Sequence, residues 1–155
     1  MLDIVDELRS FVGKLDEHQI EYALCGGMAM GVHGFARATI DIDLMILAES
    51  LESVMTIARD LGFTIRGKDL SFKDGSIEIR RISKIDSEAG DLLPLDFRLV
   101  TSRLRTIWNS RMVAEWEGGH LSVVSRDGLI ELKQLRNSGQ DIADIEALTG
   151  REKNA

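Results

Sequence analysis

Ile40-Asp41-Ile42-Asp43-Leu44-Met45-Ile46-Leu47 is the stretch with the clearest pattern in the 155-residue sequence. Side chains on a β-strand point alternately to the two faces of the sheet. As a strand, this stretch would place the apolar residues at positions 40, 42, 44 and 46 on one face and both aspartates on the other. We expect the first face to pack into a core and the opposite face to begin with two carboxylates.

Two carboxylates at positions i and i+2 of a strand have Cα atoms roughly 6–7 Å apart, so their oxygens can converge on one cation. Mg²⁺ prefers oxygen ligands and is usually held by one or two carboxylates together with substrate phosphates. A third carboxylate from a neighbouring strand would complete a two-metal site. Asp96 is the best candidate because apolar residues flank it, and Glu78, with the same pattern, is the alternative. The two aspartates could also be solvated acids on an exposed strand.

Gly26 and Gly27 follow the apolar run at 21–25 and precede a short apolar stretch at 28–34. Backbone N–H groups at the start of a helix attract phosphate oxygens, and glycine lets a phosphate approach closely. By itself the pair is as well explained by a tight turn. Because an Asp-x-Asp strand begins fourteen residues later, a phosphate-binding turn is the favoured interpretation.

The remaining sequence indicates one domain over residues 1–155. Apolar spacing predicts helices at 3–16, 28–34, 51–61, 102–110, 126–137 and 141–149. Other apolar runs predict strands at 63–66, 70–73, 76–82 and 94–100 and on either side of a turn at 117–120, with a polar loop at 83–93. Ser50 and Ser125 are predicted N-caps, and Gly62 and Gly139 are predicted to end helices. This order predicts an α+β (α/β) fold, a mixed β-sheet flanked by helices with a C-terminal helical pair.

Composition narrows the classes of function. Hydrophobic residues make up 44% of the chain, enough for a packed core, and the net charge of −7 disfavours broad binding to nucleic acid. No apolar run approaches the ~18–20 residues that span a bilayer. The first residues lack the pattern of a signal peptide, and the single Cys25 cannot form an internal disulfide. We therefore expect a cytoplasmic protein without a membrane partner.

The run Gly26-Gly27-Met28-Ala29, followed by Arg37-Ala38-Thr39-Ile40-Asp41-Ile42-Asp43-Leu44, resembles the motif of the nucleotidyltransferase superfamily and of its minimal members. Within it, the chain is most similar to the AbiEii-like proteins, some of which are toxins of type IV toxin–antitoxin systems. Leu129-Ile130-Glu131-Leu132-Lys133 and the run from Asp141 to Leu148 resemble the C-terminal helical pair of that subgroup. The resemblance covers residues 20–148.

The resemblance implies transfer of a nucleoside monophosphate from an NTP to a hydroxyl of an RNA, protein or small-molecule acceptor, dependent on Mg²⁺ (or Mn²⁺). It further implies an antitoxin or a second copy of the chain as a partner. Asp41, Asp43 and Asp96 would be the metal ligands and catalytic residues, with Asp96 as general base. The residues expected to contact the nucleotide are Gly26, Gly27, Arg37, Thr39, Lys133, Arg136 and Asp144.

Other interpretations remain open for several of these residues. Lys133 and Arg136 lie three residues apart and could form a solvated helix face paired with Glu131 or Asp144. Arg37 could pair with Asp41. Many active relatives have serine at the position of Gly27, and its absence removes a hydroxyl contact to phosphate. The alternative function is therefore a catalytically silent NTP-binding or protein-interaction module of the same fold.

Overall fold

The computed structural model describes residues 2–35, 38–117 and 119–153. The described residues form an eight-stranded mixed sheet with the strand order β3-β5-β6-β2-β1-β8-β7, and β4 pairs with β5 beside this path. The strands are β1 (Ala23–Cys25), β2 (Ile42–Ile46), β3 (Ile65–Arg66), β4 (Leu70–Phe72), β5 (Ile77–Ile85), β6 (Leu92–Leu99), β7 (Met112–Trp116) and β8 (Gly119–Val123). The helices are α1 (Ile4–Glu17), α2 (Gly26–Val32), α3 (Leu51–Asp60), α4 (Arg105–Asn109), α5 (Arg126–Arg136) and α6 (Gly139–Lys153).

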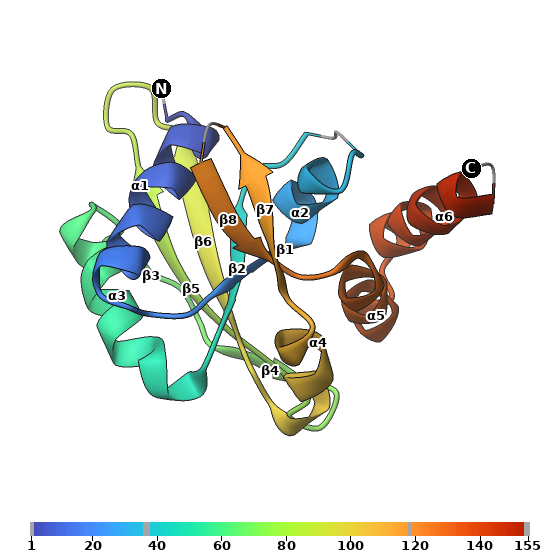
Figure 1. Cartoon of the computed structure of the whole chain (residues 1–155). Helices are drawn as coiled ribbons and strands as arrows, with labels where there is room; N and C mark the ends of the chain where they lie inside the picture. Colours follow the sequence, from blue (N-terminus) through green and yellow to red (C-terminus); the bar gives the residue numbers. More distant parts are fainter. Residues whose placement is uncertain (1, 36–37, 118, 154–155) are drawn as a thin grey trace.

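Helices cover both faces of the sheet (Figure 1). α1 and α3 lie together on one face, while α2, α4 and α5 lie on the other, and α6 packs on α5 at the outside of the molecule. The predicted α+β class, with a mixed sheet, flanking helices and a C-terminal helical pair, is confirmed.

The core between the sheet and α1 explains why β2 forms where it does. Ile42, Leu44 and Ile46 are fully buried, and Phe97 of β6 packs against Phe11 of α1 with ring centroids 5.8 Å apart. The prediction that residue 40 shares this core face is wrong. Ile40 is 80% exposed because the strand begins only at Ile42.

Met45, on the opposite face of β2, is also fully buried. The polar face is therefore confined to the start of this strand, where Asp41 immediately precedes β2 and Asp43 is its second residue. Beyond them both faces of β2 are apolar, as is usual for a strand inside a sheet that is covered on both sides.

One predicted helix boundary is confirmed in position and another is wrong. Ser50 is the N-cap residue of α3, as predicted, but it also ends a 3₁₀ turn (Ala48–Ser50) and its side chain makes no capping bond. Gly139 does not end α5. That helix ends at Arg136, and its C-cap residue Asn137 adopts a left-handed conformation with φ 54°. Gly139 instead begins α6, since the Ser138 hydroxyl accepts from the Asp141 N–H at 3.1 Å and the Asp141 carboxylate accepts from the Ser138 N–H at 2.9 Å. This reciprocal pair is a capping box.

Other boundaries are closer to expectation. Ser125 caps α5 by accepting a hydrogen bond of 3.0 Å from the Gly128 N–H, and Gly62 follows α3 with φ +96°. The loop predicted at 83–93 is shorter than expected, because β5 continues to Ile85 and β6 begins at Leu92. Within the described part of the chain, no helix has both the length and the apolar character needed to cross a bilayer.

Candidate metal and nucleotide site

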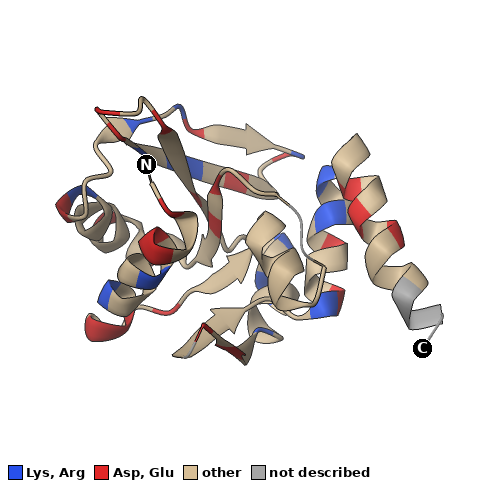
Figure 2. Cartoon of the chain, turned by 90° about the horizontal axis from the view of Figure 1, so that it is seen from above, with Lys and Arg blue, Asp and Glu red and all other residues tan. Residues whose placement is uncertain are grey.

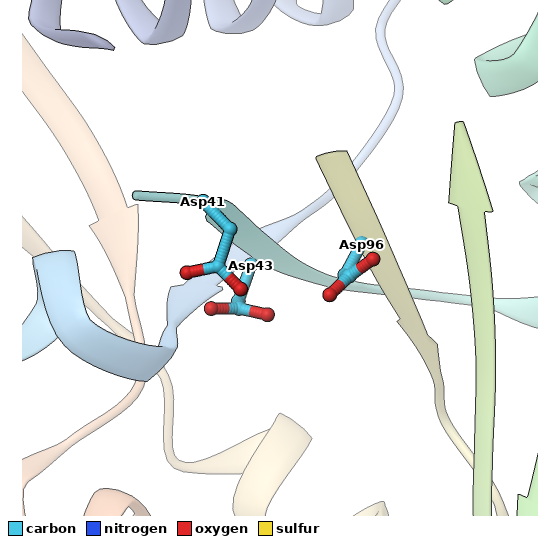
Figure 3. A group of neighbouring side chains, drawn as sticks. All are labelled: Asp41, Asp43 and Asp96. Atoms are coloured by element: carbon cyan, nitrogen blue, oxygen red, sulfur yellow. The ribbon is translucent and has the colours of Figure 1, made fainter. Parts of the chain in front are cut away.

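Three carboxylates meet on one face of the sheet, next to the start of α2. Asp43 and Asp96 are direct partners in the parallel pairing of β2 with β6, so their side chains point to the same side. Asp41 lies just before β2, two residues before Asp43, and shares that side. Each residue offers one oxygen, and these three oxygens all lie within 4.8 Å of one another (Figure 3). The structure thus brings together the three acids that the sequence singles out.

The cluster is electrostatically unfavourable without a cation. Burial, followed by the charges of Asp41 and Asp96, raises the pKa of Asp43 from 3.8 to about 7. Burial and the charge of Asp96 likewise raise the pKa of Asp41. Thr39 offsets part of this effect, because its hydroxyl lies 3.4 Å from Oδ1 of Asp41 and donates to the Asp41 carbonyl at 3.2 Å. Carboxylates held together against their mutual repulsion are typical of metal and catalytic sites.

The dimensions of the cluster fit Mg²⁺. Oxygens on opposite sides of one octahedral Mg²⁺ are about 4.2 Å apart, given bonds of 2.0–2.1 Å. Oxygens that lie within 4.8 Å of one another can therefore reach one ion with small rotations, or share two ions. The donor set contains carboxylate oxygens alone, which is the set that Mg²⁺ and Mn²⁺ prefer over softer metals.

Gly26 allows Asp43 to occupy its position. The backbone of Gly26 has φ +71°, a conformation that side chains rarely adopt. A Cβ atom added here would overlap the carboxylate of Asp43. The first glycine of the pair is therefore explained by contact with the acid, while Gly27 is a buried residue in the first turn of α2.

Arg81 of β5 holds the third acid. Its Nε donates to Oδ1 of Asp96 at 2.7 Å and its Nη2 to Oδ2 at 2.8 Å, in a bidentate pair. The hydrogen bond to Asp96 raises the pKa of Arg81. The fork fixes the plane of the carboxylate, and each oxygen keeps a second lone pair for another ligand.

α5 and α6 contribute a second group of charges. The Lys133 ammonium donates to Asp144 at 2.8 Å, and both side chains are buried. Arg136 donates to both oxygens of Asp141 at 2.7 and 2.6 Å. Burial acts to raise the pKa of Asp141, but hydrogen bonds from Arg136 and Ser138 outweigh it and lower that pKa to about 2. Figure 2 shows the acidic residues along α6 beside the basic residues of α5.

A narrow cleft joins the two groups of charges. It is lined by Gly26 and Asp43 on one side and by Lys133 and Arg136 on the other. The alternative of a solvated helix face at Lys133 is therefore wrong, because this residue is only 3% exposed. Its pairing with Asp144, one of the alternatives weighed from the sequence, is confirmed. Asp144 is thus a counter-ion of Lys133 in the structure. Its Oδ1 also accepts a hydrogen bond of 2.9 Å from the Gln140 side chain.

The remaining predicted residues are placed as follows. Thr39 lies beside Asp41, and Arg37 lies outside the described residues. Glu78 does not join the cluster, because Arg81 of the same strand pairs with Asp96 and an even-numbered residue of β5 faces the other side of the sheet. One of its oxygens accepts from Arg80 at 3.4 Å, and the other is buried without a hydrogen-bond partner.

Two arginines of this site were missed by the sequence analysis. Arg81 gave no signal, because its approach to Asp96 depends on the pairing of β5 with β6. Arg98 could have been found, because it follows Asp96 by two residues on a strand and must share its face. It lines the cleft together with Asp43 and is buried.

Comparison with known proteins gives similarity in structure alone. No family model matches the sequence, and no curated protein matches it. Protein TM1012 of Thermotoga maritima, assigned as a nucleotidyltransferase, is similar with a TM-score of 0.62 and 14% identity, over 97% of this chain and 93% of that one. ANT(2″)-Ia, solved in complex with adenylyl-2″-tobramycin, has a TM-score of 0.63 and 15% identity over 95% of this chain and 88% of its own.

A third similar structure is the lincosamide antibiotic adenylyltransferase LnuA, solved with lincomycin bound. Its TM-score is 0.58 and its identity 16%, over 93% of this chain and 95% of that one. Identities this low establish the arrangement of the elements, and they leave the AbiEii-like subgroup unassigned. The chain has the fold of the nucleotidyltransferases.

Proposed function

We propose that residues 1–155 act as one nucleotidyltransferase domain that moves a nucleoside monophosphate from an NTP to a hydroxyl, dependent on Mg²⁺ or Mn²⁺. The observation that carries this proposal is the convergence of Asp41, Asp43 and Asp96 within 4.8 Å on a fold shared with nucleotidyltransferases. Three carboxylates held this close, one buried and two partly buried, lower stability unless a cation offsets the repulsion. Its presence is best explained by a ligand that brings that cation.

Each acid has a role that follows from its surroundings. Asp41 and Asp43 lie at the start of one strand and would hold the divalent ion, which when bound neutralises phosphate charge and activates the attacking oxygen. Asp96 would accept the proton of the acceptor hydroxyl. The hydroxyl oxygen forms a bond to the α-phosphorus as the bond from that phosphorus to the β-phosphate oxygen breaks, and pyrophosphate leaves. Arg81 keeps the carboxylate of Asp96 oriented during this step.

The cleft between the acids and α5 has a volume of only about 20 Å³, so the phosphates would lie at its mouth. Lys133 and Arg136 face this cleft, which supports the nucleotide-binding role predicted for them. The turn at Gly26 and Gly27 lies next to Asp43, so its backbone N–H groups are near the expected phosphates. Positioning of the reacting groups and neutralisation of charge supply most of the catalysis in such transfers.

A small molecule is the acceptor class with the most support. Two of the similar structures are described with antibiotics or an adenylylated antibiotic, namely ANT(2″)-Ia and LnuA. The net charge of −7 argues against an unassisted RNA acceptor. An RNA or protein acceptor, a toxin role with an antitoxin partner, and pairing with a second copy stay predictions from the sequence resemblance, as does a cytoplasmic location.

Incubation with each of the four labelled NTPs, Mg²⁺ and a panel of hydroxyl acceptors tests the proposal. The panel contains aminoglycosides, lincosamides, tRNA and the protein itself. Wild-type protein should transfer label to an acceptor, and the double variant Asp41→Ala/Asp43→Ala should not. Asp60→Asn, which removes an exposed acid at the end of α3, is the matched control and should behave as wild type. Equal labelling by the double variant would overturn the proposal.

One observation favours a second candidate function. Arg81 donates to both oxygens of Asp96, so each oxygen already has one lone pair occupied before an acceptor hydroxyl approaches. The chain would then be a catalytically silent module that binds an NTP or a protein partner. Calorimetry separates the two functions: NTP binding without pyrophosphate release, for all four nucleotides and every acceptor tested, supports the silent module.

A further inference from the structure

Arg98 is a buried cation whose charge interacts with that of Asp43, but without a direct ion pair among the described residues. Its side chain is on the same face of β6 as Asp96, two residues away, and the residue is only 8% exposed. It donates no hydrogen bond to any residue that the structure describes and forms no ion pair with one. Burial of a charge that lacks such partners costs free energy. Packing does not explain an arginine here, because an apolar side chain would fill the same position without this cost.

The surroundings of Arg98 differ from those of the other cations near the cleft. Lys133 is engaged by Asp144, and Arg136 is engaged by both oxygens of Asp141. Arg81 is engaged by both oxygens of Asp96. Arg98 lines the same cleft as Asp43 and Lys133, and none of its donors is used by a described residue.

The geometry points to Arg98 as a ligand of the phosphate chain of the bound nucleotide, an inference that rests on the proposed function. The guanidinium presents a planar fork of donors that matches the oxygens of a phosphate. A polyphosphate would give Arg98 the direct partner that it lacks among the described residues. Its divalent ion would add positive charge beside Asp41 and Asp43, whose mutual repulsion the nearby arginines offset only in part. One ligand, a polyphosphate with its divalent ion, would therefore contact both Arg98 and the aspartates.

Binding of inorganic tripolyphosphate in the presence of Mg²⁺, measured by calorimetry, tests this assignment without depending on the preferred base. Loss of a charged hydrogen-bonding contact should weaken binding about 10- to 100-fold in Arg98→Met. Arg98→Lys keeps the charge and loses the fork, so we expect an intermediate affinity. Arg80→Met is the matched control, because Arg80 is a partly buried arginine of the neighbouring strand on the other face of the sheet.

Thermal unfolding separates ligand binding from a structural role. If Arg98 binds phosphate, Arg98→Met should melt no lower than wild type without ligand and should lose most of the rise in melting temperature caused by Mg²⁺ and tripolyphosphate. A lower melting temperature without ligand, together with an unchanged ligand-induced rise, would show that Arg98 only supports the fold. Arg98→Gln provides the same comparison with a polar side chain if the methionine variant fails to fold.

The outcomes for this assignment and for the proposed function are distinguishable. NTP transfer by wild type together with unchanged tripolyphosphate binding by Arg98→Met would overturn the assignment and leave the proposed function intact. Binding that depends on Arg98, without transfer to any acceptor, would support the assignment and favour the silent module. Absence of tripolyphosphate binding to the wild-type protein at millimolar concentration would overturn the assignment.

Discussion

Two groups of charged side chains lie on either side of the cleft, and they are arranged in opposite ways. In the group on β2 and β6, Asp41, Asp43 and Asp96 approach within 4.8 Å of one another with like charge. In the group on α5 and α6, Lys133 and Arg136 are matched by Asp144 and Asp141 at 2.6–2.8 Å. The second group holds two helices together. The first group opposes folding, which is expected where function requires charges that a ligand compensates.

The pKa values express the same contrast. Burial and the neighbouring acids raise the pKa of Asp43 to about 7, which means that the folded protein disfavours the ionised form of this acid. Asp141 has its pKa lowered to about 2, because its hydrogen bonds stabilise the ionised form. Mutations in the two groups should therefore change stability in opposite directions.

Substitution of Asp96 should have the largest effect. Asp96→Asn removes the proton acceptor and one metal ligand, so we expect transfer to fall by about 10²- to 10⁴-fold. Steady-state kinetics with the labelled NTP measures the change. Glu78→Gln is the control, because Glu78 faces the other side of the sheet. Loss of activity in Glu78→Gln with an active Asp96→Asn would show that the third acid has been assigned to the wrong strand.

Substitution of Lys133 should have the largest effect on stability. Lys133→Met removes a buried ion pair of 2.8 Å from Asp144, and breaking a buried pair of this kind costs about 3–5 kcal/mol of unfolding free energy. Urea unfolding measures this cost. Lys14→Met is the matched control, since Lys14 pairs with Glu17 on the exposed surface of α1 and should cost at most about 1 kcal/mol. Similar values for the two variants would contradict the structural role of the helical group.

Substitution of Asp43 should raise the unfolding free energy, whereas substitution of Lys133 lowers it. The folded protein holds the Asp43 proton up to a pH of about 7, whereas the unfolded chain releases it near its ordinary value of 3.8. The folded state therefore binds more protons between these values, and stability of the metal-free protein should fall as pH rises from about 4 to about 7. Asp43→Asn should remove this loss and raise the unfolding free energy at pH 8 by on the order of 2 kcal/mol.

Addition of Mg²⁺ should change the stability of the wild-type protein and of Asp43→Asn differently. At pH 8 it should stabilise the wild-type protein, because it binds the folded state through the three acids, and it should not stabilise Asp43→Asn. Thermal unfolding with and without Mg²⁺ measures both effects. A less stable Asp43→Asn variant at pH 8 without metal would show that the acids do not oppose folding.

Substitution of Ser138 should have the smallest effect. Ser138→Ala removes the hydroxyl that accepts from the Asp141 N–H and donates to its carboxylate at 2.7 Å, and loss of such a cap costs about 1 kcal/mol. Ser50→Ala is the control, since Ser50 makes no capping bond and its removal should be nearly neutral. Equal urea midpoints for the two variants would mean that the capping box contributes nothing to the helical pair.

The sequence reveals those parts of the site that depend on local periodicity. The alternation after Ile40 places Asp41 and Asp43 on one side of a strand, and flanking apolar residues mark Asp96 as part of another. What it cannot show is the register, because Asp43 and Asp96 become partners through a pairing across fifty-three residues of chain. The bidentate contact of Arg81 depends on a similar non-local pairing.

Local errors have local causes. Ile40 was predicted to be core, because alternation does not reveal where a strand begins. Lys133 follows Leu132 on the buried side of α5, so helical spacing indicates that it is buried. Its charge, taken alone, favours an exposed position. Glycine at position 139 favours a helix end, but a serine and an acid three residues apart, Ser138 and Asp141, are the pattern of a helix start.

Mn²⁺ binding followed by electron paramagnetic resonance, in the presence of a non-hydrolysable NTP analogue, tests the central claim most directly. The three acids are predicted to hold the ion, so wild-type protein should bind Mn²⁺ and Asp43→Asn should bind it at least about tenfold more weakly. Asp60→Asn should bind as wild type. Equal Mn²⁺ affinity in the wild-type and Asp43→Asn proteins would contradict the assignment of this cluster as a metal site.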